Sequence, residues 1–227
     1  LRFRTIDFGY TNPLVCQWWA ADNDGRAYLY RELYRTQTLV EDHAQTINDL
    51  TGGENIENTV ADHDAEDRAT LRRYDIVTAP ADKAISTGIE CVAARLRVQP
   101  DGKPRLFIMR DSLVGRDQRL FDTGKPWCTT QEFDGYVYPK SQDGKPVKEI
   151  PVQVDDHGLD CVRYGMMWLD RFLYGGPPIQ FDIESPRKYE PTEAALKMGE
   201  MFEEQELDEA GAEAERAGLW QSDEPKL

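Results

Sequence analysis

Three aspartates stand at the ends of predicted secondary-structure elements, far apart in the sequence. Asp7 closes the run RTID, Asp62 closes TVAD, and Asp160 ends DDHGLD. Carboxylates that converge repel one another unless a hard divalent cation lies between them. If the fold brings the three together, they predict a metal-dependent site for phosphoryl transfer, in which one ion activates a water and another stabilises the leaving oxygen.

The second aspartate also has a purely structural explanation. Asp is a preferred turn former and helix cap, so Asp62 could simply end its strand. Asp64 is the better cap for the helix that follows, because it stands directly before it. This leaves Asp62 available for a site.

The third aspartate has a histidine beside it on a predicted helix. His157 and Asp160 are three residues apart and therefore share one helix face. That spacing suits a shared metal or a hydrogen-bonded pair. The alternative is an ordinary first helical turn, in which Asp155 and Asp156 complement the positive end of the helix dipole.

The elements that must position these residues begin with three strands. Apolar and aromatic runs predict strands over residues 3–7, 13–21 and 27–34, and the turn DNDG joins the last two. Antiparallel pairing follows from so short a turn. A helix is expected over residues 39–50, with Thr38 as its candidate cap and Gly52 as its stop.

A second group of elements predicts parallel strands. A strand over residues 58–62, a polar helix over 64–73 and a strand over 75–79 make a βαβ unit with a right-handed crossover. A core-facing helix follows over 85–96, then a hairpin over 97–110 that turns at PDGK, then a loop-rich stretch over 115–143 with aromatic strand fragments. The last strong helix covers residues 157–174.

This order of elements is that of the ribonuclease H-like fold. We expect a mixed α/β sheet, with three antiparallel strands followed by parallel strands, flanked by helices. Its first strand is central, so Asp7 and Asp62 should stand at neighbouring strand ends. Asp160 then arrives on a helix packed against the same edge.

Length and composition predict one main domain with an extension. The 227 residues, of which 40% are hydrophobic, are enough to bury a core. We expect the domain over residues 1–178 and an acidic extension, partly helical or disordered, over 179–227. The chain begins with Leu1 and not Met, which indicates a domain excised from a longer protein.

The mean hydropathy of −0.66 predicts no membrane span, and four scattered cysteines fit a reduced, cytosolic setting.

The net charge of −15 lowers the expected affinity for nucleic acid. Residues 190–227 hold twelve acidic and three basic residues, so −9 of the charge lies there and −6 remains for the first 189 residues. Transient handling of DNA by the domain is therefore not excluded. The apolar positions after residue 191 leave two interpretations open, a solvated tail or a docking helix.

Four motifs, taken in order, resemble a known family. They are IDFGYTNP (residues 6–13), VADHDAED (60–67), Lys83 followed by ISTGI (85–89), and DHGLDCVRYG (156–165). As an ordered set over roughly residues 1–175, they are similar to the C-terminal nuclease domain of the large terminase subunit of tailed bacteriophages. One departure is the second motif, where the family more often has a single acid. The second ligand therefore stays open between Asp62 and Asp64.

The resemblance implies a ribonuclease H-like endonuclease that cuts concatemeric double-stranded viral DNA with Mg or Mn during genome packaging. By motif position, the catalytic and metal-binding residues would be Asp7, Asp62 and Asp160, assisted by His157 or Asp156. Lys83 would face the phosphate backbone, unless it is a solvated lysine at a helix start. Independently of the resemblance, the basic residues Arg97, Lys103 and Arg105 of the predicted hairpin are candidates for phosphate contacts; the alternative is a solvated surface loop.

The resemblance also implies partners and a location. The partners are a terminase ATPase domain, a portal and a small terminase subunit, and the location is the cytoplasm of an infected bacterial host. This chain has no G-x-x-x-x-G-K-[ST] loop of the kind that such an ATPase domain would carry. Two other classes remain open: another ribonuclease H-like nuclease such as a resolvase, and a non-catalytic module that docks on the portal or capsid. A serine or cysteine hydrolase is disfavoured, because the three histidines lie near no nucleophile motif.

Overall fold

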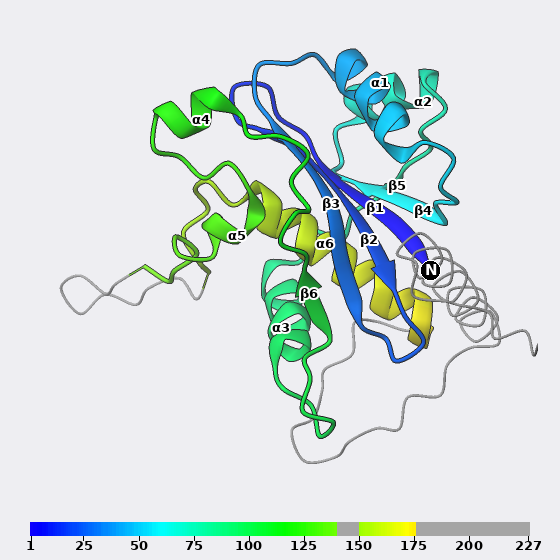
Figure 1. The fold of residues 1–227 in the computed structure, drawn as a ribbon, viewed down its shortest axis with the longest axis vertical. Helices are drawn as coiled ribbons and strands as arrows, with labels where there is room; N and C mark the ends of the chain where they lie inside the picture. The colour runs from blue at the N-terminus through cyan, green and yellow to red at the C-terminus, as the bar shows by residue number, and fades with distance from the viewer. Residues whose placement is uncertain (140–149, 176–227) are drawn as a thin grey trace, which may run out of the picture.

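A six-stranded mixed sheet forms the centre of the molecule in the computed structural model, which describes residues 1–139 and 150–175 (Figure 1). Its strands are β1 (Arg2–Asp7), β2 (Leu14–Ala21), β3 (Ala27–Arg35), β4 (Asn58–Ala61), β5 (Ala79–Pro80) and β6 (Leu106–Ile108). The helices are α1 (Val40–Thr51), α2 (Ala65–Arg73), α3 (Ile85–Leu96), α4 (Gln118–Asp122), α5 (Thr129–Glu132) and α6 (His157–Tyr174).

The strand order is β5-β4-β1-β2-β3-β6, with β1 inside the sheet. The first three strands pair antiparallel, β4 and β5 continue parallel to β1, and β6 runs parallel to β3. The expected ribonuclease H-like arrangement, three antiparallel strands followed by parallel ones, is therefore confirmed. The turn before β3 also forms as expected, with Gly25 at a φ of 71°.

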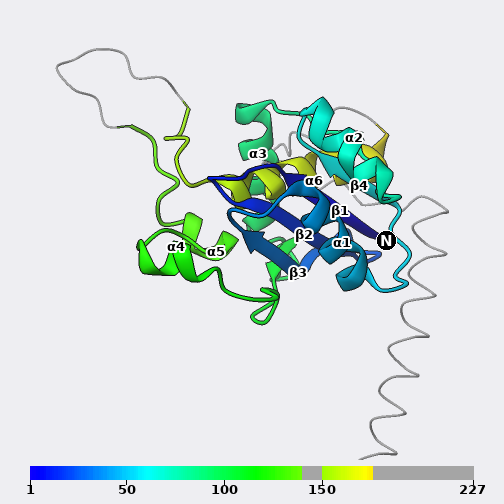
Figure 2. The same ribbon diagram turned by 90° about the horizontal axis from the view of Figure 1, so that it is seen from above.

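Helices cover both faces of the sheet (Figure 2). Because side chains alternate along a strand, Ile6 of β1 packs with α1 and α2 on one face, whereas Phe3 packs with α3 and α6 on the other. Asp7 follows Ile6 and has the parity of Phe3. It therefore points toward the face that α6 covers.

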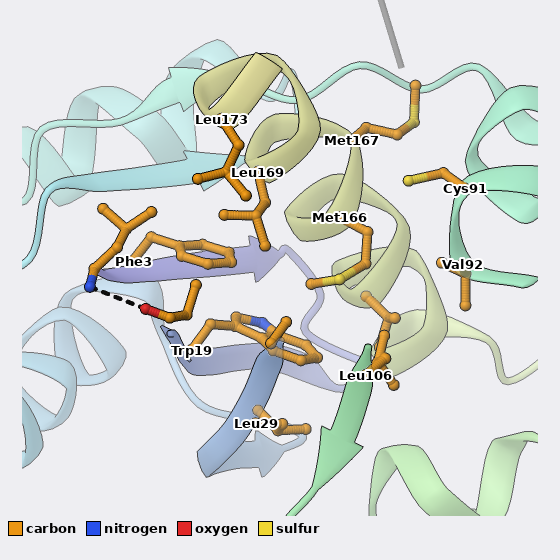
Figure 3. Close-up of a cluster of buried hydrophobic side chains, with 14 residues drawn as sticks. Phe3, Trp19, Leu29, Cys91, Val92, Leu106, Met166, Met167, Leu169 and Leu173 are labelled. Carbon is orange, nitrogen blue, oxygen red and sulfur yellow. Dashed lines mark hydrogen bonds between the residues drawn. The ribbon is translucent and has the colours of Figure 1, made fainter. Parts of the chain in front are cut away.

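The core beneath α6 is dense and apolar (Figure 3). Phe3 and Trp19 stack there with ring centroids 6.2 Å apart, below Met166 and Leu169 of α6. Gly165 lets the helix approach this closely, since a Cβ there would lie 3.0 Å from Thr5 and 3.2 Å from Phe3. The contact fixes the height of α6 above β1.

Three predicted local features are wrong. The expected hairpin over 97–110 is a turn, closed by Gln99 N donating to the Lys103 carbonyl, followed by the single strand β6. The strand expected over 75–79 is reduced to two residues, and Asp75 before it has a φ of 61° that no strand allows. Thr38 does not cap α1, because its hydroxyl donates to the Thr36 carbonyl.

The segment expected to be loop-rich with strand fragments contains two short helices in its described part, α4 and α5. Asp117 caps α4 by accepting hydrogen bonds from two backbone N–H groups. The remaining elements begin and end within about two residues of their expected bounds, as is usual for helix ends.

Several expectations fall outside the described residues. These are the amphipathic segment after residue 191, the extension over 179–227 and the end of the 115–143 stretch. The boundary between domain and extension stays a prediction. In the described part of the chain, no helix is both long and apolar enough to cross a membrane.

Candidate active site

Asp7 and Asp62 stand side by side at the ends of two parallel strands. In the β1–β4 pair, Ile6 lies opposite Ala61, so the next residues, Asp7 at the end of β1 and Asp62 just after β4, emerge at the same edge. The pairing continues one step further, because the Asp62 N–H donates to the Ile6 carbonyl at 3.0 Å. Asp64 instead caps α2, with its side chain accepting from the Glu66 and Asp67 N–H groups at 3.0 Å. The structure thus brings Asp62, and not Asp64, to the edge beside Asp7.

The first turn of α6 completes this edge. His157 Nδ1 lies 2.9 Å from Asp7 Oδ2, and Asp160 stands on the same helix face. Asp7 is 6% exposed, so its contact with the histidine is largely shielded from water. Residues separated by 150 positions in the chain therefore form one cluster.

Each carboxylate already has a hydrogen-bonding partner within the protein. Lys83, just before α3, forms an ion pair with Asp62. Arg163 forms an ion pair with Asp160, which also accepts from the Tyr164 hydroxyl at 3.3 Å. The helical spacing could have predicted the two partners of Asp160, because Arg163 and Tyr164 follow it by three and four positions and therefore share its helix face.

Burial and mutual repulsion raise the pKa of Asp7. Burial is the largest cause, the His157 contact opposes it, the charges of Asp160 and Asp62 add to it, and the net effect is a pKa of about 6. For His157, burial acts to lower the pKa, but the Asp7 carboxylate outweighs it and leaves the pKa raised. The pair is thus a strongly coupled acid and base.

Asp62 shows the opposite balance. Partial burial acts to raise its pKa, but the hydrogen bonds from Lys83 and the His63 backbone outweigh it and hold the pKa below its usual value. Asp62 is therefore ionised at neutral pH.

The donor set suits a hard divalent cation by its chemistry. Carboxylate oxygens are the ligands that Mg and Mn prefer. Asp156 adds a further one: it is 9% exposed, burial and the Asp160 charge raise its pKa, and its Oδ2 has no hydrogen-bond partner. Over residues 1–139 and 150–175, no three acidic, histidine or cysteine side chains are close enough together to hold an ion as they stand.

A carboxylate from α5 supports the first turn of α6. Glu132 is 2% exposed and accepts from the Gly158 N–H at 2.9 Å and from the Leu159 N–H at 2.7 Å. Burial raises its pKa to about 8, against the effect of its hydrogen-bond donors. Sequence reasoning missed Glu132, because it lies in a four-residue helix with no periodic pattern to mark it.

The predicted DNA-contacting residues separate into two places. Lys83 lies beside Asp62. Arg97, Lys103 and Arg105 lie on the segment between α3 and β6, which Figure 1 shows at the opposite end of the sheet from the end of β1. There, Arg105 forms an ion pair with Asp101 at 2.9 Å.

Known structures share this architecture, although no protein-family model and no curated protein matches the chain in sequence. The large terminase of a thermophilic bacteriophage aligns with a TM-score of 0.55 at 21% identity, over 73% of this chain and 38% of that one. The nuclease domain of the P22 large terminase aligns with a TM-score of 0.50 at 17% identity, over 81% of this chain and 86% of that one. The nuclease domain of the SPP1 large terminase, solved with bound Mn, gives 0.49 at 17% identity, over 72% and 83%.

The chain spans about 38% of the length of the large terminase from the thermophilic phage. Its fold is that of the P22 nuclease domain along most of both chains. The fold implied by the four sequence motifs is thereby confirmed: the described residues have the ribonuclease H-like fold of large-terminase nuclease domains.

Proposed function

We propose that this chain is a divalent-metal-dependent endonuclease domain that hydrolyses double-stranded viral DNA, as part of a large terminase. The observation that carries the proposal is the meeting of Asp7, Asp62 and the His157–Asp160 turn at one edge of this fold. Carboxylates brought together by two parallel strand ends and one helix are ligands suited to the divalent ions that promote phosphodiester hydrolysis.

Asp7, Asp62 and Asp160 would hold the cation, and Asp156 would assist. When bound, Mg or Mn would supply Lewis-acid stabilisation of charge on the phosphate oxygens. The contact with Asp7 holds the His157 ring at the cluster, where its other nitrogen can exchange a proton with a water or an alcohol group. Lys83 is half-exposed, so its ammonium group can turn from Asp62 toward a DNA phosphate.

The terminase resemblance supports the choice of substrate and partners. Concatemeric viral DNA, a motor ATPase domain, a portal and a small subunit, in the cytoplasm of the infected host, are what this role implies. Arg97, Lys103 and Arg105 stay candidates for contact with DNA beyond the cleavage point, because a duplex held at Asp7 would have to extend along the sheet to reach them.

Plasmid cleavage tests the proposal. Purified protein is incubated with supercoiled DNA and Mn, Mg, Ca or EDTA, beside Asp7→Ala and the control Asp49→Ala, which changes an exposed acid on α1. We expect nicking and linearisation in Mn or Mg for the wild type and the control, and none for Asp7→Ala. Circular dichroism and thermal unfolding establish that each variant is folded.

Several outcomes contradict the proposal. Cleavage that survives in EDTA, or in folded Asp7→Ala, would assign the activity to another site or to a contaminant. No cleavage by the wild type in any metal at low salt would favour the docking module. A marked preference for branched over linear DNA would favour a resolvase.

A further inference from the structure

The first turn of α6 is capped by a side chain from another element. A helix N-terminus leaves backbone N–H groups without partners inside the helix, and the residue before the helix usually accepts from them. Asp156 stands at that position, but its side chain makes no capping hydrogen bond. The Gly158 and Leu159 N–H groups donate instead to Glu132, one to each carboxylate oxygen.

The helix that carries Glu132 is tied to the sheet by buried contacts. The Thr129 N–H donates to Glu32 of β3 at 3.1 Å, and Gln17 of β2 donates both to Thr129 Oγ1 at 2.7 Å and to the Gly158 carbonyl at 2.9 Å. Tyr34 donates to Glu132 Oε1 at 2.7 Å. Glu32 and Tyr34 of β3 therefore hold Glu132 and its helix through contacts that do not involve α6, while Gln17 of β2 bridges α5 and α6.

The contact between Glu132 and α6 lies between His157 and Asp160, the two candidate site residues of this helix. Gly158 and Leu159 separate His157 from Asp160, so fixing their amides fixes both neighbours. The approach is close: a Cβ on Gly158 would overlap Thr129 Oγ1 and lie 3.0 Å from Glu132 Oε2. Capping by Glu132 also leaves Asp156 Oδ2 buried without a partner in the described structure.

We propose that Glu132 is a positioning residue of the site: it caps α6 in place of Asp156, leaves that carboxylate available as a ligand, and holds His157 against Asp7. The part concerning a ligand rests on the proposed function. The part concerning His157 does not, because the His157–Asp7 contact exists without a metal.

Glu132→Gln tests the proposal without changing the size of the side chain. In either orientation of the amide, its NH₂ group faces one of the two backbone N–H groups, so at least one donor is left unpaired. Tyr34→Phe is the matched control. It removes a hydrogen bond from the same carboxylate but keeps both contacts to α6.

Two measurements separate positioning from general destabilisation. In metal-free protein, nitrogen-15 NMR of the His157 ring, assigned with His157→Asn, reports the contact with Asp7. Calorimetric titration with Mn reports the ligand set, where loss of a supporting hydrogen bond typically weakens affinity by about tenfold or more. We expect Glu132→Gln to shift the ring signals and weaken Mn binding, and Tyr34→Phe to do neither, although both lower the melting temperature.

The two proposals fail separately. If the wild type binds no Mn, the proposed function fails, while the His157 signals still decide the role of Glu132. Unchanged ring signals in Glu132→Gln would overturn the positioning role. Equal effects of Glu132→Gln and Tyr34→Phe would also overturn it, because they would make the contact merely structural.

Discussion

At the scale of single residues, Asp7 is a buried carboxyl group, and burial disfavours its ionised form. The pKa of Asp7 is raised to about 6, first by burial and then by the charges of Asp160 and Asp62. A raised pKa in the folded state means that folding favours the protonated carboxyl. The contribution of Asp7 to stability is therefore fully present below its unfolded pKa near 3.8 and is lost as the pH rises through 6.

This gives a prediction for the metal-free protein. Asp7→Asn removes the ionisation, so the variant should gain stability over the wild type as the pH rises from 4 to 7, by at most about 3 kcal/mol. Urea unfolding in EDTA across this range measures the difference. Asp49→Asn is the control, since that side chain is exposed. A constant difference between Asp7→Asn and wild type would mean that the carboxyl does not titrate with folding.

The sequence could predict which aspartates lie close together, but not all of the contacts that hold them in position. Strand order alone places Asp7 beside Asp62, because the carboxyl ends of adjacent parallel strands lie at one edge of the sheet. Spacing along a helix likewise predicts that Arg163 reaches Asp160. Glu132 could not be found this way, since its partners are backbone amides of an element 26 residues later and depend on tertiary packing alone.

At the scale of elements, the site depends on how closely α6 lies on the sheet. Gly165 faces β1 at the point of closest approach. Gly to Ala within a helix normally stabilises it by up to about 1 kcal/mol. Here the added methyl group would meet Thr5 and Phe3 of the central strand, and overpacking of this kind typically costs about 1–3 kcal/mol.

We therefore predict that Gly165→Ala lowers the unfolding free energy, reversing the usual sign. Urea unfolding measures it, with Gly115→Ala as the control, because a Cβ at Gly115 meets nothing within 4 Å. The variant should also cleave DNA more slowly, since a displaced α6 moves Asp160 away from Asp7. An unchanged or higher stability would show that the helix can shift without strain.

The helices predicted from strong apolar periodicity, α1, α3 and α6, formed as expected, whereas the hairpin predicted around PDGK did not. PDGK does form a turn, but α3 extends to Leu96 and leaves only residues 97–99 before the turn, so no first hairpin strand forms there. Leu106 joins the core with Val92 and Met166, which draws the segment onto the open edge of β3 as a parallel strand. Turn residues predict a change of direction, whereas the pairing partner is decided by the core.

At the scale of the whole molecule, charge is distributed unevenly. Near the turn between β2 and β3, Arg26 forms ion pairs with Asp22, Asp24 and Asp101, so its charge is already neutralised. Residues 179–227 add fourteen acidic and five basic residues, a net charge of −9. The net charge of the whole chain, −15, opposes the approach of a DNA duplex at low ionic strength.

A chain that ends at residue 178 should consequently bind duplex DNA more tightly than the full chain. The gain should be largest at low salt and vanish as salt rises, because screening reduces the interaction between separated charges. Fluorescence anisotropy with Asp7→Ala protein in EDTA measures affinity without cleavage. A full-length variant in which nine of the fourteen acids in 179–227 are changed to amides brings the net charge of the extension to zero and so separates charge from bulk: it should match the shortened chain. If it binds like the full chain while the shortened chain binds more tightly, the extension acts by covering the DNA-binding surface and not by its charge.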